Sequence, residues 1–365
     1  MIRGVDAKMR RNLFKYGASP LLGGGLGWGL IPQKKNATHQ IKYLKRTYSL
    51  ITLFTYSLKE KIMQIKENFE IKNLTTFKIG GQVEKLYLPE TLEEFTNLLR
   101  ELDNYIVLGS CSDVLFSSNG YKGNIILTTE MKNFEIRGTK VYADCGVKDP
   151  LLSQKVADVS LSGLEFLIGL PGTIGGAVYM NAGAHGQCIA DVIVSCCLFD
   201  KETKEVVFKQ KSEMNFSYRH SILHEGRYIL LSAEFELKKL PQEEIKELME
   251  RNLTFRKNIQ PSLKDPNAGS VFKNPENDSA GRLLDKAGVK SFENEAVRVW
   301  DKHANFIVNK GNATSEDVLE LMVKMYQAVK DIYTIELKPE IIFIGDKTKK
   351  EEELCNILYK TKTQK

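Results

Sequence analysis

The feature that most constrains this chain is a glycine-rich stretch that runs from Gly163 to Gly186 and contains seven glycines. Four of the seven fall within eight positions, at Gly169, Gly172, Gly175 and Gly176. Because glycine lacks a Cβ, it permits a positive φ and lets another group come close to the backbone. A turn of this kind can direct several N–H groups at one phosphate. We therefore predict that this stretch, anchored by apolar flanking residues, binds a phosphate-bearing ligand.

The spacing of these glycines excludes two standard phosphate-binding motifs. A P-loop ends in Gly-Lys-Ser/Thr, whereas Ala177 and Val178 follow Gly176 here. A Rossmann fingerprint needs G-x-G-x-x-G after a strand, but the spacing here is G-x-x-G-x-x-G-G. A tight structural turn between two buried elements remains the alternative. The glycine density, with Asn181 and Gly183 just after it, favours ligand binding.

The positive charge of the chain is concentrated at its N-terminus. Residues 1–62 hold twelve basic residues (Lys or Arg) and two acidic ones (Asp or Glu). The remainder of the chain holds 40 basic and 44 acidic residues. Because the remainder is mildly acidic, it lacks the positive charge typical of a nucleic-acid-binding surface. The apolar runs of the first 62 residues are too short to span a membrane. A basic start followed by an apolar patch could be a targeting segment. We instead expect residues 1–62 to be an extension that is disordered or not native, with the natural start at Met63.

Cysteine and histidine spacing predicts neither disulfides nor a metal site. None of the six cysteines forms a C-x-x-C pair, and no convincing signal peptide precedes them, so they indicate reduced thiols in a cytoplasmic protein. His220 and His224 are four residues apart, but no third ligand is evident nearby. We therefore predict ordinary surface or pocket histidines and no bound metal.

Periodicity indicates an α+β protein with a larger ligand-binding domain followed by a smaller one. Thr91 to Leu102 has helical spacing with Thr91 as its cap, and Ser315 to Ile332 has the pattern of a long helix capped at Ser315. We predict a final strand from Glu336 to Ile344. The expected boundaries are 63–240 for the first domain, which has two subdomains, 241–346 for the second, and 347–365 for a loose lysine-rich tail.

The first of the two candidate phosphate-binding turns along the chain follows a short predicted strand at residues 105–108; the glycine-rich stretch contains the second. The first turn reads Gly-Ser-Cys-Ser-Asp from Gly109 to Asp113. A strand followed by such a turn is a further candidate for phosphate binding.

Seven separated motifs occur in the order typical of one enzyme family. They are Asn73–Gly81, Leu108–Leu115, Gly163–Gly186, Tyr218–Ser221, Ala268–Pro275, His303–Asn309 and Leu337–Gly345. Any one of these motifs is weak evidence, but seven in order are specific. From about Asn73 to Gly345, the sequence resembles the UDP-N-acetylenolpyruvoylglucosamine reductases, flavoenzymes of bacterial cell-wall synthesis.

The resemblance implies a fold, a reaction and its cofactors. The fold is an FAD-binding domain of the vanillyl-alcohol oxidase (PCMH) type, followed by a smaller α+β substrate-binding domain. The reaction reduces UDP-N-acetylglucosamine enolpyruvate to UDP-N-acetylmuramate for peptidoglycan precursor synthesis, with non-covalent FAD as cofactor and NADPH as reductant. We expect a cytoplasmic monomer. Another FAD oxidoreductase of the same fold, such as a sugar or hydroxy-acid oxidase, is the alternative.

The resemblance also assigns catalytic roles to three residues from distant parts of the chain. Hydride from N5 of the reduced flavin adds to C3 of the enolpyruvyl group, and negative charge develops at C2 and in the carboxylate. Arg219 matches the family's residue that stabilises this charge, and Ser270 matches the donor of the proton to C2. Glu340 matches the acidic partner, and its apolar neighbours predict that burial raises its pKa. Without the resemblance, each of the three would be interpreted as an ordinary surface or turn residue.

The same motifs supply the other expected site residues. The flavin-binding residues lie in the two glycine-containing turns and just after the second: Gly109, Ser112, Asp113, Gly169, Gly172, Thr173, Gly175, Gly176, Asn181 and Ala182. The expected substrate contacts are Tyr218, Arg256, Lys273 and Asn274. Arg256 is expected at the nucleotide phosphates, because basic groups attract polyanionic ligands.

Two positions of the first turn depart from the family pattern Gly-x-Gly-Ser-Asn. Cys111 replaces a glycine, and Asp113 replaces an asparagine. A carboxylate near a diphosphate repels it unless the carboxylate points away or pairs with a cation. Only 50 residues separate Arg219 from Ser270, which resembles the subclass that lacks an inserted substrate-covering loop.

Overall fold

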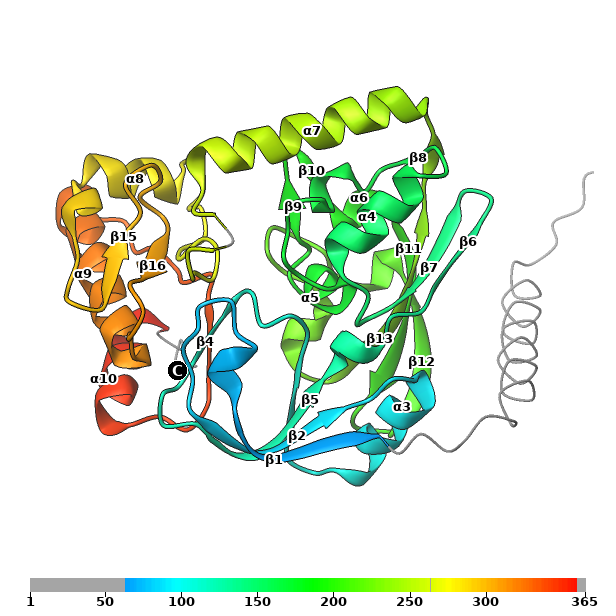
Figure 1. The fold of residues 1–365 in the computed structure, drawn as a ribbon, viewed down its shortest axis with the longest axis horizontal. Coiled ribbons are helices and arrows are strands. Elements are labelled where there is room, and N and C mark those ends of the chain that lie inside the picture. Colours follow the sequence, from blue (N-terminus) through cyan, green and yellow to red (C-terminus); the bar gives the residue numbers. More distant parts are fainter. Residues whose placement is uncertain (1–62, 263, 360–365) are drawn as a thin grey trace, which may run out of the picture. The chain divides into compact units, whose positions relative to one another are not determined.

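The computed structural model describes residues 63–262 and 264–359, and Figure 1 gives the order of their elements. The expectation for the extension 1–62 lies outside the described residues. No helix in the described part of the chain is long and apolar enough to cross a membrane. The predicted boundary between residues 240 and 241 stays a prediction; strand β14 ends at Lys239, and helix α7 begins at Gln242.

A four-stranded sheet forms the first part of the described chain. Its order is β1-β2-β5-β3, with β1 antiparallel to β2, and β5 parallel to both β2 and β3. Helix α3 follows β2, and a reciprocal capping box between Thr91 and Glu94 fixes its start, which confirms the predicted helix and cap. The elements are β1 (Gln64–Glu70), β2 (Gln82–Leu88), α3 (Leu92–Glu101), β3 (Tyr105–Leu108), β4 (Val114–Phe116) and β5 (Tyr121–Leu127).

A five-stranded antiparallel sheet with the order β12-β11-β13-β7-β6 forms the second part. Phe199 of β11, Phe235 of β13 and Ile174 of α5 are fully buried in one core, and burial of such a side chain contributes about 1.5–3 kcal/mol. This packing holds α5, which follows the glycine-rich turn, against the sheet. The elements are β6 (Phe134–Arg137), β7 (Lys140–Asp144), α4 (Asp149–Ala157), β8 (Leu161–Ser162), α5 (Ile174–Tyr179), β9 (Gly183–Ala184), β10 (Gln187–Cys188), α6 (Ile189–Val192), β11 (Ile193–Asp200), β12 (Glu205–Gln210), β13 (Tyr228–Glu236) and β14 (Lys238–Lys239).

The last part of the described chain is mainly helical. Figure 1 shows α7 running from the end near β8 toward α8. The long helix α9 buries an apolar stripe that includes Val318, Met322 and Met325. The elements are α7 (Gln242–Ile259), α8 (Ala280–Lys286), β15 (Val297–Val299), β16 (Ile307–Asn309), α9 (Ser315–Tyr333), β17 (Ile342–Ile344) and α10 (Lys349–Leu358).

Strand β17 joins the last part to the first by pairing in parallel with β4. The amide of Ile342 donates to the carbonyl of Asp113 at 3.1 Å, directly after the first polar turn. Phe77 and Leu115 of the first part share a core with α8, α9 and α10. The pairing therefore fixes the residues just before β17, including Glu340, against the turn that ends at Asp113.

Two predictions near the C-terminus are wrong. The tail expected to be loose forms helix α10, because Cys355 and Leu358 are buried in the core with α9 and a capping box links Thr348 to Glu351. The predicted strand 336–344 is reduced to Ile342–Ile344. Before that strand, the amide of Glu340 donates to the carbonyl of Val271 at 2.8 Å, so Glu340 pairs with the segment after Ser270 and not with β4.

The predicted cap of α9 is wrong by one residue. Thr314 is the cap, because its hydroxyl accepts from the amide of Asp317 at 3.2 Å. The hydroxyl of Ser315 is instead engaged by Ser118 and by the buried carboxylate of Glu351. Glu351 also accepts from Ser117 at 2.8 Å, so the network joins α9 and α10 to the turn between β4 and β5.

Candidate active site

The two glycine-containing turns predicted from the sequence meet in space. A Cβ on Gly109 would overlap the hydroxyl oxygen of Thr173, and a Cβ on Gly172 would overlap the carboxylate of Asp149. None of the four clustered glycines of the second turn has a positive φ, so close approach of other groups rather than unusual φ explains Gly169, Gly172 and Gly175. Gly176 has open space beside it, which leaves room for a ligand.

The first turn presents backbone amides that are available to an anion. The amides of residues 110–113 donate no hydrogen bond to another described residue. Cys111 has a φ of +51°, a conformation in which a glycine would be unstrained, and its side chain is buried. The hydroxyl of Thr173 is buried without a partner among the described residues. Successive amides and an unpartnered hydroxyl form a suitable cradle for a phosphate-bearing ligand.

Asn181 links the glycine-rich stretch to a second tight turn. Its side-chain amide donates to the carbonyl of Ser217 at 3.0 Å, and its side-chain oxygen accepts from the amide of Ala190 at 3.0 Å. Ala182 follows it and accepts from the amide of Ile189. Asn181 thus positions the turn that begins at Ser217, while the flavin contacts expected for Asn181 and Ala182 stay predictions.

Arg219 lies at the tip of this turn and forms an ion pair with Glu340. Ser217 and His220 exchange two backbone hydrogen bonds of 3.2 Å, which places Tyr218 and Arg219 at the two corners. Arg219 has a φ of +53°, and its Nε lies 2.5 Å from Oε1 of Glu340. Its Nη2 donates to the carbonyl of Gly183 at 3.3 Å. The structure therefore joins Arg219 and Glu340, which are 121 residues apart in the sequence, in an ion pair that the sequence did not predict.

The segment that carries Ser270 runs beside this pair. The amide of Glu340 donates to Val271, the residue after Ser270. Lys273 Nζ donates to the carbonyl of Arg219 at 3.4 Å, and the amide of Asn274 donates to the hydroxyl of Tyr218 at 3.2 Å. The structure therefore brings Lys273, Asn274 and Tyr218 together with the ion pair.

Asn305 fixes the Ser270 segment and was not identified from the sequence. Its side chain makes two hydrogen bonds to the backbone of buried Phe272, accepting at 2.9 Å and donating at 2.8 Å. Its own carbonyl accepts from Val271 at 2.9 Å. The motif from His303 to Asn309 contained this residue, but only the folded chain shows what it binds.

Burial and neighbouring carboxylates perturb the charges of the site. Burial raises the pKa of Glu340, as predicted, although Arg219 and Lys273 oppose the shift. Burial also raises the pKa of Asp113 well above its usual range, and the charge of Glu340 adds to this effect while Arg219 and Lys273 oppose it. A raised pKa makes the Asp113 carboxyl less inclined to carry the negative charge that would repel a nearby diphosphate.

A cavity of about 320 Å³ includes Glu340 and Lys273 in its wall. Tyr179 and Met180, which end the glycine-rich helix, line another side. Cys355 and Tyr359 come from α10 and the residue after it, a contribution that the sequence did not predict. The cavity is thus lined by residues from the second and last parts of the chain.

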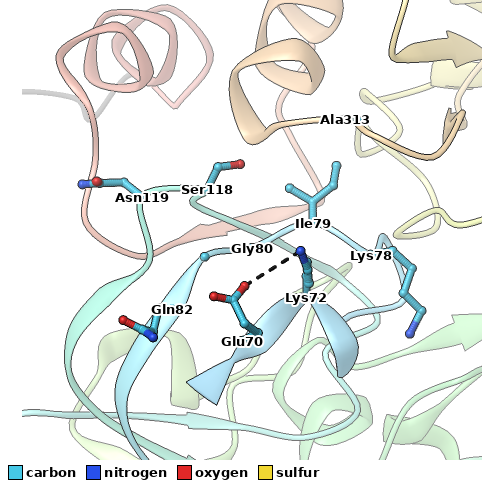
Figure 2. A pocket seen from close by; sticks show the side chains of 10 residues that line it. Glu70, Lys72, Lys78, Ile79, Gly80, Gln82, Ser118, Asn119 and Ala313 are labelled. Atoms are coloured by element: carbon cyan, nitrogen blue, oxygen red, sulfur yellow. Dashed lines mark ion pairs between the residues drawn. The ribbon is translucent and has the colours of Figure 1, made fainter. Parts of the chain in front are cut away.

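A second hollow, of about 470 Å³, contains none of the predicted site residues (Figure 2). It is lined by the hairpin between β1 and β2, by Ser118 and Asn119, and by Ala313. Lys72 lies 4.0 Å from Glu70 in an exposed ion pair, so its charge is partly offset. We therefore assign the chemistry to the cavity that contains Glu340.

Arg256 lies apart from the ion pair, against the glycine-rich stretch. Its stem passes so close to Gly169 that a Cβ there would clash with Cδ and Nε of Arg256. Burial lowers the pKa of Arg256 to about 10, so the guanidinium stays charged at neutral pH. The structure thus brings Arg256 to the turn predicted to bind a phosphate.

The histidines and cysteines show no metal-binding arrangement. The rings of His220 and His224 lie 5.0 Å apart, and His224 also stacks on Tyr179 at 4.0 Å. In the described residues, no group of three or more His, Cys, Asp or Glu could hold a metal ion. All six cysteines are free thiols.

Known proteins combine the same two domains. Residues 84–207 match the family described as FAD binding domain, and residues 260–344 match the C-terminal domain of UDP-N-acetylenolpyruvoylglucosamine reductase. The reductase of that name from Caldicellulosiruptor bescii is 39% identical over 298 residues, which cover 80% of this chain and 95% of the relative. The chain belongs to the UDP-N-acetylenolpyruvoylglucosamine reductase family. A family member from Bacillus licheniformis is 38% identical over 298 residues, with 80% and 97% covered.

A solved structure agrees with this assignment. The crystal structure of the reductase from Thermus caldophilus matches with a TM-score of 0.68 and 34% identity, covering 77% of this chain and 99% of that chain. Membership of the reductase family confirms the predicted α+β fold with an FAD-binding domain and a C-terminal domain. FAD also fits the residues present, because the free amides of residues 110–113 and the unpartnered hydroxyl of Thr173 suit its diphosphate.

Proposed function

We propose that this chain reduces UDP-N-acetylglucosamine enolpyruvate to UDP-N-acetylmuramate, a precursor of peptidoglycan, with NADPH as reductant. The observation that carries the proposal is the 2.5 Å pair of Arg219 and Glu340 beside the segment of Ser270 and Lys273. FAD, when bound, would supply the hydride for C3 of the enolpyruvyl group, with NADPH as the source of that hydride. The residues of this chain stabilise the resulting charge and supply the proton.

We assign Arg219 the role of stabilising the negative charge that develops at C2 and in the attached carboxylate. Its Nε is engaged by Glu340, and one Nη2 hydrogen by Gly183. A guanidinium has five N–H donors, so several stay available for a carboxylate. Because the two protein contacts fix the plane of the guanidinium, little reorganisation is needed as charge develops.

Ser270 is the residue that we assign to proton donation at C2. A serine hydroxyl is a weak acid, so it needs developing charge beside it and a group that restores its proton. Glu340 is a suitable group, because burial raises its pKa and its amide binds the residue next to Ser270. Lys273, three residues after Ser270, adds positive charge near the same place.

The flavin-binding residues and the molecular setting complete the proposal. Gly109, Ser112 and Asp113 of the first turn and residues 169–176 of the second hold the diphosphate. Tyr218, Arg256, Lys273 and Asn274 contact the substrate. We further propose a cytoplasmic monomer, and non-covalent FAD that is reduced by NADPH.

The test of this function separates the two half-reactions. Purified protein is expected to be yellow and to sustain repeated turnover of NADPH only when the enolpyruvyl nucleotide is present. For Ser270→Ala, we expect near-normal reduction of the flavin by NADPH, but reduction of the enolpyruvyl group slower by about 10²–10⁴-fold. Ser291→Ala, a surface serine of the same domain, is the control. Equal losses in both half-reactions would remove Ser270 from the proton-donor role, and protein that stays colourless with added FAD would contradict the function.

A further inference from the structure

An exposed aromatic ring on α7 lies outside every site assigned above. The side chain of Phe255 is 55% exposed, more than the exposed rings of Tyr218 at 52% and Phe208 at 42%. The ring of Phe255 meets that of His185 in an edge-on arrangement, with centroids 5.4 Å apart and planes at 82°. An exposed apolar residue needs no explanation when it stands alone, but Phe255 has charged neighbours that suit a ligand.

The contact with His185 connects this ring to the proposed catalytic arginine. His185 lies in the β9–β10 hairpin, two residues after Gly183, whose carbonyl accepts from Arg219 at 3.3 Å. Two residues of extended chain span at most about 7 Å. Arg256, the residue after Phe255 on α7, places its stem against Gly169 of the glycine-rich stretch. Phe255 therefore contacts the hairpin that binds the catalytic arginine and precedes the residue that contacts the turn proposed to bind the flavin diphosphate.

Two positive charges accompany the ring. Burial lowers the pKa of His185, and the charges of Arg256 and Arg251 lower it further, so His185 is neutral near pH 7. Neither arginine forms an ion pair with a carboxylate in the part of the chain that the structure describes. An uncharged aromatic surface next to two unneutralised guanidinium groups complements a flat base joined to a diphosphate.

We propose that Phe255, supported by His185, is the stacking surface for the base of a nucleoside diphosphate, and that Arg251 and Arg256 bind its phosphates. The proposal rests on the function proposed above, because both the enolpyruvyl substrate and NADPH contain a nucleoside diphosphate. The connection through Gly183 to Arg219 favours the uridine diphosphate of the substrate, since that diphosphate is attached to the sugar that bears the reacting group. Stacking on an aromatic side chain suits any base, and the arginines add affinity through charge.

The experiment compares Phe255→Ala with Phe208→Ala, the same truncation at an exposed phenylalanine on β12. For the FAD-loaded enzyme, we measure KM for the enolpyruvyl nucleotide and for NADPH, and the Kd of uridine diphosphate and of NADP⁺ by calorimetry. Phe255→Ala is expected to raise KM for the enolpyruvyl nucleotide and the Kd of uridine diphosphate by about 5- to 100-fold, which is the usual effect of losing one base stack. Phe208→Ala is expected to change neither, and Phe255→Trp is expected to retain tight binding.

Each outcome decides the proposal. A rise confined to NADPH and NADP⁺ supports the stacking surface and assigns it to the reductant instead of the substrate. Unchanged constants in Phe255→Ala, or equal changes in Phe208→Ala, would overturn the proposal. Phe255→Leu binding as tightly as Phe255→Trp would also overturn it, because a generic apolar contact would then suffice. Wild-type enzyme that lacks turnover would refute the proposed function alone, since the two calorimetric titrations still test the surface.

Discussion

Replacing Asn305 by alanine is expected to weaken both the fold and the proposed proton transfer. Asn305 is 3% exposed, and Phe272, to which it binds, is fully buried. Asn305→Ala removes a 2.9 Å bond from the Phe272 amide and a 2.8 Å bond to the Phe272 carbonyl. A buried backbone group left without a partner costs about 1–3 kcal/mol. Two such groups predict a free energy of unfolding lower by about 2–4 kcal/mol, allowing for some access of water to the cavity.

The effect on chemistry follows from the position of Ser270. Phe272 is two residues from Ser270. If the backbone of Phe272 shifts after these bonds are lost, the Ser270 hydroxyl proposed to protonate C2 is displaced as well. A displacement of about 1 Å costs on the order of 10²-fold in rate. We therefore expect reoxidation of the reduced flavin by the enolpyruvyl nucleotide to slow by about 10- to 100-fold, measured by anaerobic stopped-flow absorbance. Reduction by NADPH should stay near normal.

Asn309, the last residue of β16, supplies a matched control four residues further along the chain. It is also 3% exposed, and it binds the carbonyl of Phe77 at 2.9 Å and the amide of Gly311 at 2.7 Å. Asn309→Ala should destabilise the protein by a similar amount in urea unfolding at saturating FAD, yet leave the substrate half-reaction near normal. Equal slowing in the two variants, or an Asn305→Ala stability within about 0.5 kcal/mol of wild type, would refute the positioning argument.

Three further predictions concern the ion pair, the two turns and a buried carboxyl. Glu340→Gln should keep its FAD but reduce the enolpyruvyl nucleotide about 10²–10⁴-fold more slowly in stopped-flow traces; an unchanged rate would exclude Glu340 from proton supply. Gly109→Ala should weaken FAD binding in fluorescence titrations by about 10-fold or more, whereas the same change in a Thr173→Ala background should have little effect, because the clashing hydroxyl is gone; equal effects in both backgrounds would place the clash elsewhere. Burial raises the pKa of Asp149 well above its usual range, so the free energy of unfolding should fall as pH rises from the unfolded pKa of about 3.9 toward the folded value. Asp149→Asn should remove that part of the pH slope in urea unfolding, and an unaltered slope would contradict the assignment.

Local signals in the sequence predicted local structure well. Thr91 and Glu94 lie three residues apart, and they form the capping box that their spacing indicates. The spacing of Thr348 and Glu351 is the same, so the start of helix α10 could have been predicted despite its lysine-rich sequence. The cap of α9 was assigned to Ser315, although Asp317 stands three residues after Thr314 and forms a capping box with it. The hydroxyl of Ser315 is engaged by the distant Glu351, which the sequence did not indicate.

The family motifs named the expected site residues, but they did not show how the folded chain brings these residues together. No periodicity links Arg219 to Glu340, because the turn at Ser217 and the pairing of β17 with β4 are both needed to bring them together. The sequence allowed both positive φ and close approach for the glycines of the second turn, and their partners Asp149 and Arg256 lie in other elements that the spacing did not indicate. Phe255 showed no sequence signal, since an exposed ring on a charged helix is distinguishable only by its neighbours.

The pairing of β17 with β4 has a consequence for biosynthesis. A ribosome releases the chain from its N-terminus, so the turn at Gly109 to Asp113 emerges long before the strand that holds it. Until Ile342 to Ile344 have left the exit tunnel, the amide that binds the Asp113 carbonyl is missing. Contacts so distant in sequence form late and slow the folding of a domain. A nascent chain stalled before residue 342 would therefore hold the flavin poorly, and the cofactor would be secured only as synthesis ends.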